Sequence, residues 1–249
     1  MLRFIMDSIV YILAPFVFLA YATEALTGFG AALVAVTLGA HFYPIDKLVP
    51  VLVPLNVIVT GYIAIRHHKE IERDLLLKRI LPFMGCGVVA GTLLFPLLAG
   101  PLLRWILGVV VTVFAARELI LLKTKKRQGP PFSFWVAGAW KFVAGIVHAF
   151  YTTGGPPLVY AVSRLNLSKG VFRATLCTVW STMNLIMIVI FVSNGRINSE
   201  SIALTGSLLP LLPLGILAGE WFHGRINERG FRIFIYCLLL LTGIALLVR

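Results

Sequence analysis

The sequence predicts an all-α polytopic membrane protein built from two internally repeated helical halves. Its 249 residues are 59% hydrophobic and only 13% charged, with a mean hydropathy of +0.94, whereas soluble domains carry roughly 25% charged residues. Two glycine-rich motifs interrupt the apolar stretches at corresponding places. Matching Pro, Gly and Arg residues recur at a constant spacing, which indicates a duplication.

Ten apolar runs predict 8 to 10 membrane segments. A helix needs about 20 residues to cross the hydrocarbon core. Two runs, 30–42 and 156–167, are shorter than that and predict half-helices or the arms of re-entrant hairpins. The longer runs are 4–26, 48–65, 80–99, 101–122, 132–153, 171–194, 201–222 and 231–248.

Each short run follows a motif that disfavours continuous helix. The first is Thr27-Gly28-Phe29-Gly30-Ala31-Ala32-Leu33, and the second is Thr152-Thr153-Gly154-Gly155-Pro156-Pro157-Leu158. Paired glycines, and paired prolines in the second motif, interrupt a helix. Broken backbone is tolerated in a bilayer only where protein or a polar cavity surrounds it. The two breaks therefore predict a cavity between them, which in secondary transporters marks the substrate site.

The duplication is read from residues 128 positions apart (209 − 81, for example). Leu81-Pro82, Gly87, Gly91 and Arg104 correspond to Leu209-Pro210, Gly215, Gly219 and Arg232, and Asn56 corresponds to Asn184. Gly30 and Gly155 are 125 apart, which indicates a small insertion between. The predicted organisation is a first half over 1–122, a basic linker over 123–131 and a second half over 132–249.

The basic residues predict an orientation. The loop 66–79 and the linker 123–131 are basic, and the positive-inside rule places both in the cytoplasm. Five further basic residues share that side only if the second half is inverted relative to the first, which favours an inverted repeat. They are Arg164, Lys169, Arg173, Arg225 and Arg229. Because the net charge of +12 lies mainly in loops, we interpret it as an orientation signal and not as a nucleic-acid footprint.

The start of each half-helix predicts an anion site, because its unpaired N–H groups carry partial positive charge. Pro156 supplies no N–H, so the second break must use Gly154, Gly155 and later residues. The alternative is that the glycines only allow close helix packing. The side chains expected to shape this pocket are those of Thr27, Phe29, Thr152 and Thr153.

Five polar residues inside apolar runs are candidates for function. Lys141 lies near the middle of its run, where charge is costly, and is a candidate substrate ligand; a lysine reaching the interface is the alternative. Glu24 and His148 are candidates for proton coupling. Glu24 could instead form a structural ion pair with Lys141, and His148 could be a core residue. Asn56 and Asn184 could bind substrate or brace facing helices.

Nothing in the sequence indicates an enzyme, a cofactor or a metal site. Cys86, Cys177 and Cys237 are scattered in apolar segments, at spacings that fit neither a disulfide framework nor a metal. Paired carboxylates at catalytic spacing, HExxH, Gly-x-Ser-x-Gly and P-loop motifs do not occur. The expected partners are a small anion and the lipid bilayer but no nucleic acid, and a homodimer stays open.

The glycine motifs resemble those of the sulfite exporter TauE/SafE family. The first is similar to its GFGGG signature, with Ala31 and Ala32 where glycines are common, a departure that could narrow the first pocket. Thr153-Gly154-Gly155-Pro156-Pro157-Leu158 and Phe172-Arg173-Ala174-Thr175-Leu176 resemble the family's GGP and RA-T signatures, and the resemblance covers nearly the whole chain. The site positions that it implies are Gly28, Gly30, Gly154, Gly155, Pro156 and Arg173.

The resemblance implies an integral inner-membrane transporter of sulfur-containing anions, such as sulfite or organosulfonates, that works without ATP hydrolysis. The expected function is therefore a secondary transporter, and in particular an exporter. Three alternatives stay open: an anion channel with the same pore, a carrier of a different small organic anion, and a membrane-embedded enzyme or scaffold.

Overall fold

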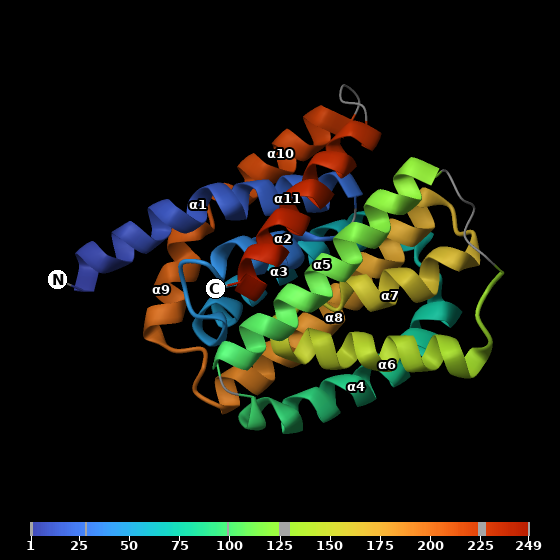
Figure 1. Ribbon diagram of the computed structural model, residues 1–249, viewed down its shortest axis with the longest axis horizontal. Coiled ribbons are helices and arrows are strands. Elements are labelled where there is room, and N and C mark those ends of the chain that lie inside the picture. Colours follow the sequence, from blue (N-terminus) through green and yellow to red (C-terminus); the bar gives the residue numbers. More distant parts are fainter. Residues whose placement is uncertain (1, 28, 99, 125–129, 224–227, 249) are drawn as a thin grey trace.

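The computed structural model describes residues 2–27, 29–98, 100–124, 130–223 and 228–248, which form helices and no strand (Figure 1). This confirms the predicted all-α class. Of the predicted linker 123–131, residues 125–129 lie outside the described residues. The helices before the linker are α1 (Leu2–Thr27), α2 (Ala31–Gly39), α3 (Ile45–Arg66), α4 (Leu81–Leu94) and α5 (Gly100–Thr124). The later ones are α6 (Phe134–Tyr151), α7 (Gly155–Val162), α8 (Lys169–Ser193), α9 (Ser199–Leu208), α10 (Leu211–His223) and α11 (Glu228–Val248).

Five helical stretches are long and apolar enough to cross a membrane. A bent pair, Ser199–Leu208 with Leu211–Gly219, makes a sixth if its 42° bend is counted as one broken span. Among the described residues, Ile9–Ala25 and Ile233–Val248 are apolar but shorter. These helices indicate an integral membrane protein with five or six candidate spans, and the predicted 8 to 10 segments are not confirmed. The five are Ile45–Arg66, Leu75–Leu97, Pro101–Thr124, Phe134–Tyr151 and Lys169–Ser193.

The apolar run 201–222 does not form one continuous helix. The helix α9 ends at Leu208, and α10 begins at Leu211 after a bend of 42°. Pro210 lies between them, where its ring and its missing N–H prevent a continuous helical ladder. Pro210 therefore causes the break, and the hydropathy of the run does not reveal it.

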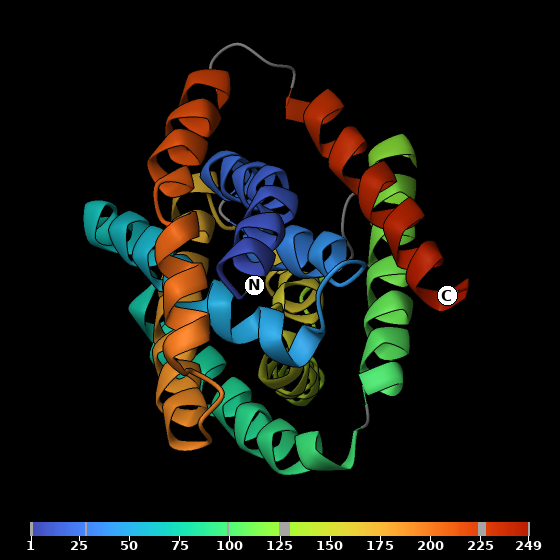
Figure 2. The same cartoon turned by 90° about the vertical axis from the view of Figure 1, so that its left-hand side faces the viewer.

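Short helices follow both glycine-rich motifs. The helices α2 and α7 have nine and eight residues, or roughly 14 and 12 Å at 1.5 Å per residue, well short of a core about 30 Å thick. Gly30 precedes α2 with a left-handed φ of 107°, and Thr152 follows α6 with a φ of 52°. Every residue of α2 is buried. Figure 2 shows α2 (blue) and α7 (yellow) inside a ring of longer helices, so protein surrounds the broken backbone.

Four helix pairs make the framework around the short helices: α1 with α10, α4 with α6, α3 with α8, and α5 with α11. Small residues allow the close approaches. A Cβ added at Gly87 of α4 would clash with the carbonyl oxygen of Phe142 in α6, and one added at Gly215 of α10 would lie 3.0 Å from Cβ of Tyr21 in α1. Such contacts are typical of helix packing in membranes.

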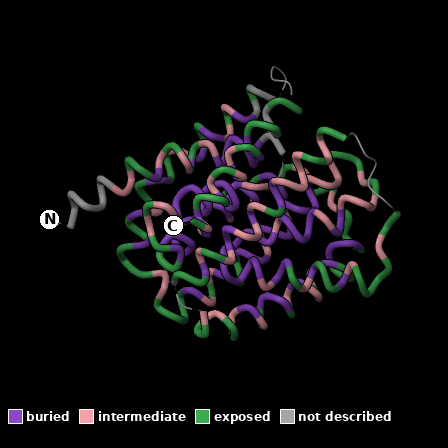
Figure 3. Tube along the Cα trace, in the orientation of Figure 1, coloured by how far each residue is buried: buried purple, intermediate pink, exposed green. Residues whose placement is uncertain are grey.

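Buried residues gather in the centre of the molecule and exposed ones on its outer helices (Figure 3). The exposed residues of α4 and α5 include Val89, Leu93, Trp105 and Val113, each more than half exposed. A soluble protein rarely shows large apolar patches, and lipid is the natural cover for such a surface. The packed interior therefore lies at the centre, where the two breaks also lie.

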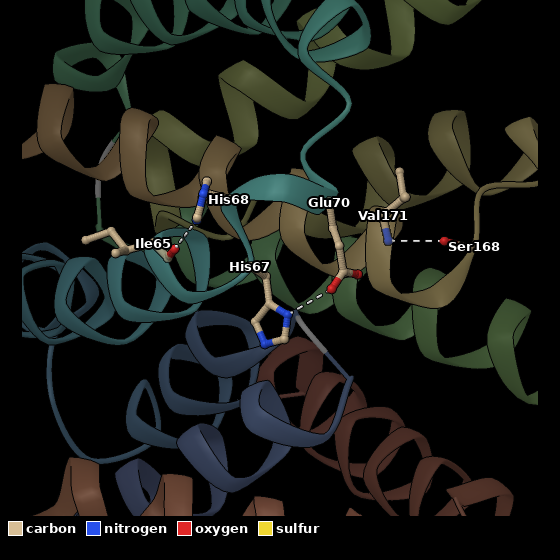
Figure 4. Close-up of polar contacts among 6 residues, drawn as sticks. All are labelled: Ile65, His67, His68, Glu70, Ser168 and Val171. Carbon is tan, nitrogen blue, oxygen red and sulfur yellow. Dashed lines mark hydrogen bonds and ion pairs between the residues drawn. The ribbon is translucent and has the colours of Figure 1, made fainter.

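The loop after α3 packs on the start of α8 (Figure 4). Nδ1 of His67 lies 3.1 Å from Oε1 of Glu70, and Nδ1 of His68 lies 3.0 Å from the carbonyl oxygen of Ile65. The carboxylate of Glu70 lies against Gly170 in the first turn of α8, where negative charge is favourable. The N–H of Glu72 donates to Oγ1 of Thr175 at 3.0 Å. These contacts fix the end of α8 that carries Arg173.

Candidate functional site

A small cavity lies where the two breaks meet. Its volume is about 20 Å³, and a single water needs roughly 10–15 Å³ on this measure. The cavity therefore has room for about one water molecule. The first half contributes Glu24, Phe29, Gly30, Ala32, Leu33 and Asn56. The second half contributes Thr152, Thr153, Gly155, Pro156 and Trp180.

At the first break, a carboxylate of the chain itself occupies the start of α2. The N–H of Ala31 donates to Oε2 of Glu24 at 2.7 Å. The left-handed turn at Gly30 brings α2 back toward α1, and so places Ala31 beside a residue seven positions earlier. Glu24 is 2% exposed, and its Oε1 has no hydrogen-bond partner among the described residues. The anion site predicted at this helix start is therefore filled from within.

At the second break, hydroxyl groups take the place of backbone donors. Pro156 and Pro157 follow Gly155 as the second and third residues of α7 and offer no N–H groups. Thr152 donates its hydroxyl to the carbonyl oxygen of Tyr151 at 2.7 Å. The hydroxyl of Thr153 is buried without a partner in the described part of the chain. Of these two threonines, Thr153 is thus the one with a donor to spare.

Asn56 and Trp180 close the cavity from α3 and α8. Oδ1 of Asn56 has no hydrogen-bond partner among the residues described, and the side chain is 5% exposed. Thr60, one turn later, donates to the carbonyl oxygen of Asn56 at 2.8 Å. Trp180 lines the cavity, and its ring stacks on that of His148, which does not line it, at a centroid distance of 6.0 Å. The indole therefore separates His148 from the cavity.

His148 and Asn184 form a second buried polar pair behind Trp180. Both are 0% exposed, and Asn184 lies beside His148. Neither the ring nitrogens of His148 nor the amide atoms of Asn184 make a hydrogen bond of good geometry with the described residues. Both residues were predicted for the site, and the structure places them next to its wall without exposing them to the cavity.

Three other predicted residues lie away from the cavity. Lys141 lines a separate cavity of about 160 Å³ together with Arg79, and no ion pair joins it to Glu24 among the described side chains. Arg173 is half-buried on α8, and its charge acts on Glu24 without lining the cavity. Gly154 packs against the carbonyl oxygen of Ala144.

Thr27 ends α1 but its side chain is not described, and Gly28 lies outside the described residues.

Trp180 is a lining residue that the sequence interpretation misses. It lies one turn before Asn184 on α8, a polar residue that the interpretation does select, so helical spacing from Asn184 could have indicated it. Among the described lining residues, Glu24 is the only ionisable one, and Lys and Arg are absent. Recognition of an anion here must therefore rely on hydroxyl, amide and backbone dipoles.

An open groove lies on the other side of α7. It has a volume of about 430 Å³ and lies between α5, α6 and α7. Val110, Val113, Val143 and Pro157 make its walls apolar. Pro156 lines both this groove and the central cavity. The helix α7 is thus a partition one helix thick between the two spaces.

Comparison with known proteins gives one match. A family model described as sulfite exporter TauE/SafE matches residues 13–246, nearly the whole chain. Neither the search of curated proteins nor the search of solved structures gives a match.

Proposed function

Because this chain belongs to the sulfite exporter TauE/SafE family, we propose that it is a secondary transporter that exports small sulfur-containing anions, such as sulfite or organosulfonates. The family consists of membrane transporters and not of enzymes. One observation carries the finer proposal, namely that residues of both glycine-rich breaks line the same cavity, together with Glu24, Asn56 and Trp180.

Neutral donors would hold the anion in this cavity. The N–H groups of Ala32 and Leu33 lie in the first turn of α2, where they have no partner within the helix. The hydroxyl of Thr153 and the amide of Asn56 face the same space. Oriented dipoles in a site without bulk water stabilise an oxyanion strongly, since the low dielectric constant strengthens each hydrogen bond.

The size of the cavity supports a carrier over a channel. A volume of about 20 Å³ is too small for an oxyanion with several heavy atoms, so uptake into the site requires the two halves to move. A channel would need an open path past Trp180 and Pro156. We therefore retain the channel and a carrier of another small organic anion as alternatives, and favour alternating access.

The helix contacts support two repeated halves. Suppose that α1, α2, α3, α4 and α5 correspond to α6, α7, α8, α10 and α11. On exchange of the halves the pair α1–α10 then becomes α6–α4, while the pairs α3–α8 and α5–α11 are each unchanged. Gly30 and Gly154, which precede α2 and α7, are 124 residues apart, and so are Glu24 and His148.

The positions of basic residues support the inverted arrangement with cytoplasmic loops 66–79 and 123–131. Glu70 lies against Gly170, Arg164 donates to the carbonyl oxygen of Pro130, and Arg229 donates to that of Leu122. The starts of α8 and α11 thus share a side with the loop and the linker. Arg196 donates instead to the carbonyl oxygen of Asp46, at the start of α3 and so on the other side. This distribution follows the positive-inside rule.

A proton could accompany the anion. Glu24 and His148 are the ionisable residues at equivalent positions of the two proposed halves, one lining the cavity and the other shielded by Trp180. We propose Glu24 as the group in contact with the transported anion in the state described, with His148 as its counterpart when the halves exchange conformations.

The test is substrate flux in proteoliposomes after a thermal-shift screen with sulfite, thiosulfate, sulfate, taurine and sulfoacetate. Thr153→Val removes one hydroxyl from the cavity and should lower flux about tenfold, the effect of one lost hydrogen bond. Thr112→Val is the matched control, because Oγ1 of Thr112 is also buried without a described partner but lies at Gly243, between α5 and α11. Equal flux in both variants would reject the proposed site.

A further inference from the structure

The Glu24 carboxylate occupies the place at which α2 would bind a foreign anion. Its Oε2 accepts the hydrogen bond from Ala31, the first residue of this nine-residue helix, and the side chain lines the central cavity. We propose that Glu24 is a resident anion, which the transported anion displaces from Ala31 in each cycle. This inference rests on the proposed function and adds a competitor to its site.

Three unpaired polar atoms line the same cavity, and the hydroxyl of Thr153 is the one among them that can donate a hydrogen bond to an incoming anion, whereas the Glu24 and Asn56 oxygens are acceptors. Oε1 of Glu24, Oδ1 of Asn56 and Oγ1 of Thr153 are all buried, and none has a hydrogen-bond partner among the residues that the structure describes. Buried polar atoms without partners are unfavourable. The Glu24 carboxylate is therefore held by a single hydrogen bond, and Thr153 has a donor available for another anion.

The groups around Glu24 offer a second position for its carboxylate. Within the described residues, the ionisable groups whose charges interact with it are Tyr21 on α1 and Arg173 and Cys177 on α8. Arg173 is the cation among them. It is half-buried, and its Nε has no partner among the described residues. A carboxylate displaced from Ala31 would move toward this guanidinium.

The exchange explains how a cavity lined by a carboxylate can accept an anion. One negative charge arrives at the start of α2 as another leaves it, so the helix terminus is always neutralised. When the transported anion departs, Glu24 returns to Ala31. The structure, with its cavity of about 20 Å³, is then the resting state, in which the Glu24 carboxylate occupies the start of α2.

The first experiment replaces the carboxylate from outside. Glu24→Ala should leave the Ala31 N–H without its partner, and sodium formate should bind there. We expect formate to raise the melting temperature of purified Glu24→Ala by roughly 3 °C, with no rise for the wild type, whose site is filled. Equal effects of formate on both proteins would overturn the proposal.

The second experiment removes the charge and keeps the shape. Glu24→Gln retains an oxygen that can accept from Ala31, and its binding of sulfite or thiosulfate should tighten about tenfold because a charged competitor has been removed. Glu72→Gln neutralises an exposed acid in the loop after α3 and should bind like the wild type. Unchanged or weaker binding by Glu24→Gln would overturn the proposal.

The two experiments separate this inference from the function on which it rests. If sulfur anions bind no variant while formate stabilises Glu24→Ala, the proposed substrate class fails and the resident anion stands. If sulfur anions bind the wild type but neither Glu24 variant responds, the resident anion fails and the function stands. If Glu24→Ala does not fold, the binding measurement on Glu24→Gln decides.

Discussion

At the first break the amide of Ala31 binds the Glu24 carboxylate, whereas at the second break α7 begins with a glycine and two prolines that offer few amides. In the proposed repeat, the counterpart of Glu24 is His148, which stacks on Trp180 and does not line the cavity. Residues of both breaks line the same cavity, but the two breaks provide different hydrogen-bond donors there. Two similar breaks therefore supply different chemical groups to one cavity, a carboxylate at the first break and hydroxyl groups at the second.

The largest expected effect distinguishes the glycines of the two breaks. A Cβ at Gly154 would clash with the carbonyl oxygen of Ala144, so Gly154→Ala should cost roughly 3 kcal/mol of stability. Gly30 has φ 107° but free space, with Thr23 Cγ2 as the nearest atom at 3.7 Å, so Gly30→Ala should cost about 1–2 kcal/mol. Thermal unfolding in detergent measures both.

Gly155→Ala is the control for this pair, because an added Cβ meets no atom within 4 Å. Its melting temperature should stay near that of the wild type. A Gly154→Ala protein that melts with this control would show that the second break is not tightly packed.

The next effect compares the packing of the two halves. Gly87→Ala would drive a methyl group into the backbone of α6, whereas Gly215→Ala would bring one to 3.0 Å from the Cβ of Tyr21. We expect a loss of roughly 3 kcal/mol for Gly87→Ala, as for Gly154→Ala, and less than half of that for Gly215→Ala. The melting temperatures give the order, and the reverse order would contradict the packing described.

A functional comparison follows from the paired asparagines. Asn56 lines the cavity, so Asn56→Leu should weaken anion binding about tenfold through the loss of one hydrogen bond. Asn184 lies behind Trp180 with an unpartnered amide in the described structure, so Asn184→Leu should change affinity in this closed state much less. Equilibrium binding of the anion found in the screen measures both, and equal losses would mean that Trp180 does not shield the second pair.

The smallest effect is expected at Lys141. Its cavity, shared with Arg79, is separate from that of Glu24. Lys141→Met should therefore change the anion affinity less than twofold, because Lys141 does not line the cavity in which we propose that the anion binds. A tenfold loss would return Lys141 to the site and indicate that the two cavities join during transport.

Local chemistry determined which features the sequence could predict. The breaks at Gly30 and Gly154-Gly155 were predictable, because glycine and proline act on their own backbone. The bend near Pro210 carries the same signal, yet the hydropathy of its run concealed it. Lys141 was placed by counting residues along a helix, which gives depth but not the direction in which the side chain points. The bond from Ala31 to Glu24 depends on the direction of the turn at Gly30, and neither residue reveals that alone.

The helix α7 has a consequence for how this protein could be inhibited. Pro156 lines both the central cavity, where we propose that the anion binds, and the apolar groove between α5, α6 and α7. A hydrophobic compound dissolved in the bilayer would reach that groove laterally from the lipid, without crossing water. There it would contact α7 on the side of the groove. Drugs against such a carrier need not imitate its cargo.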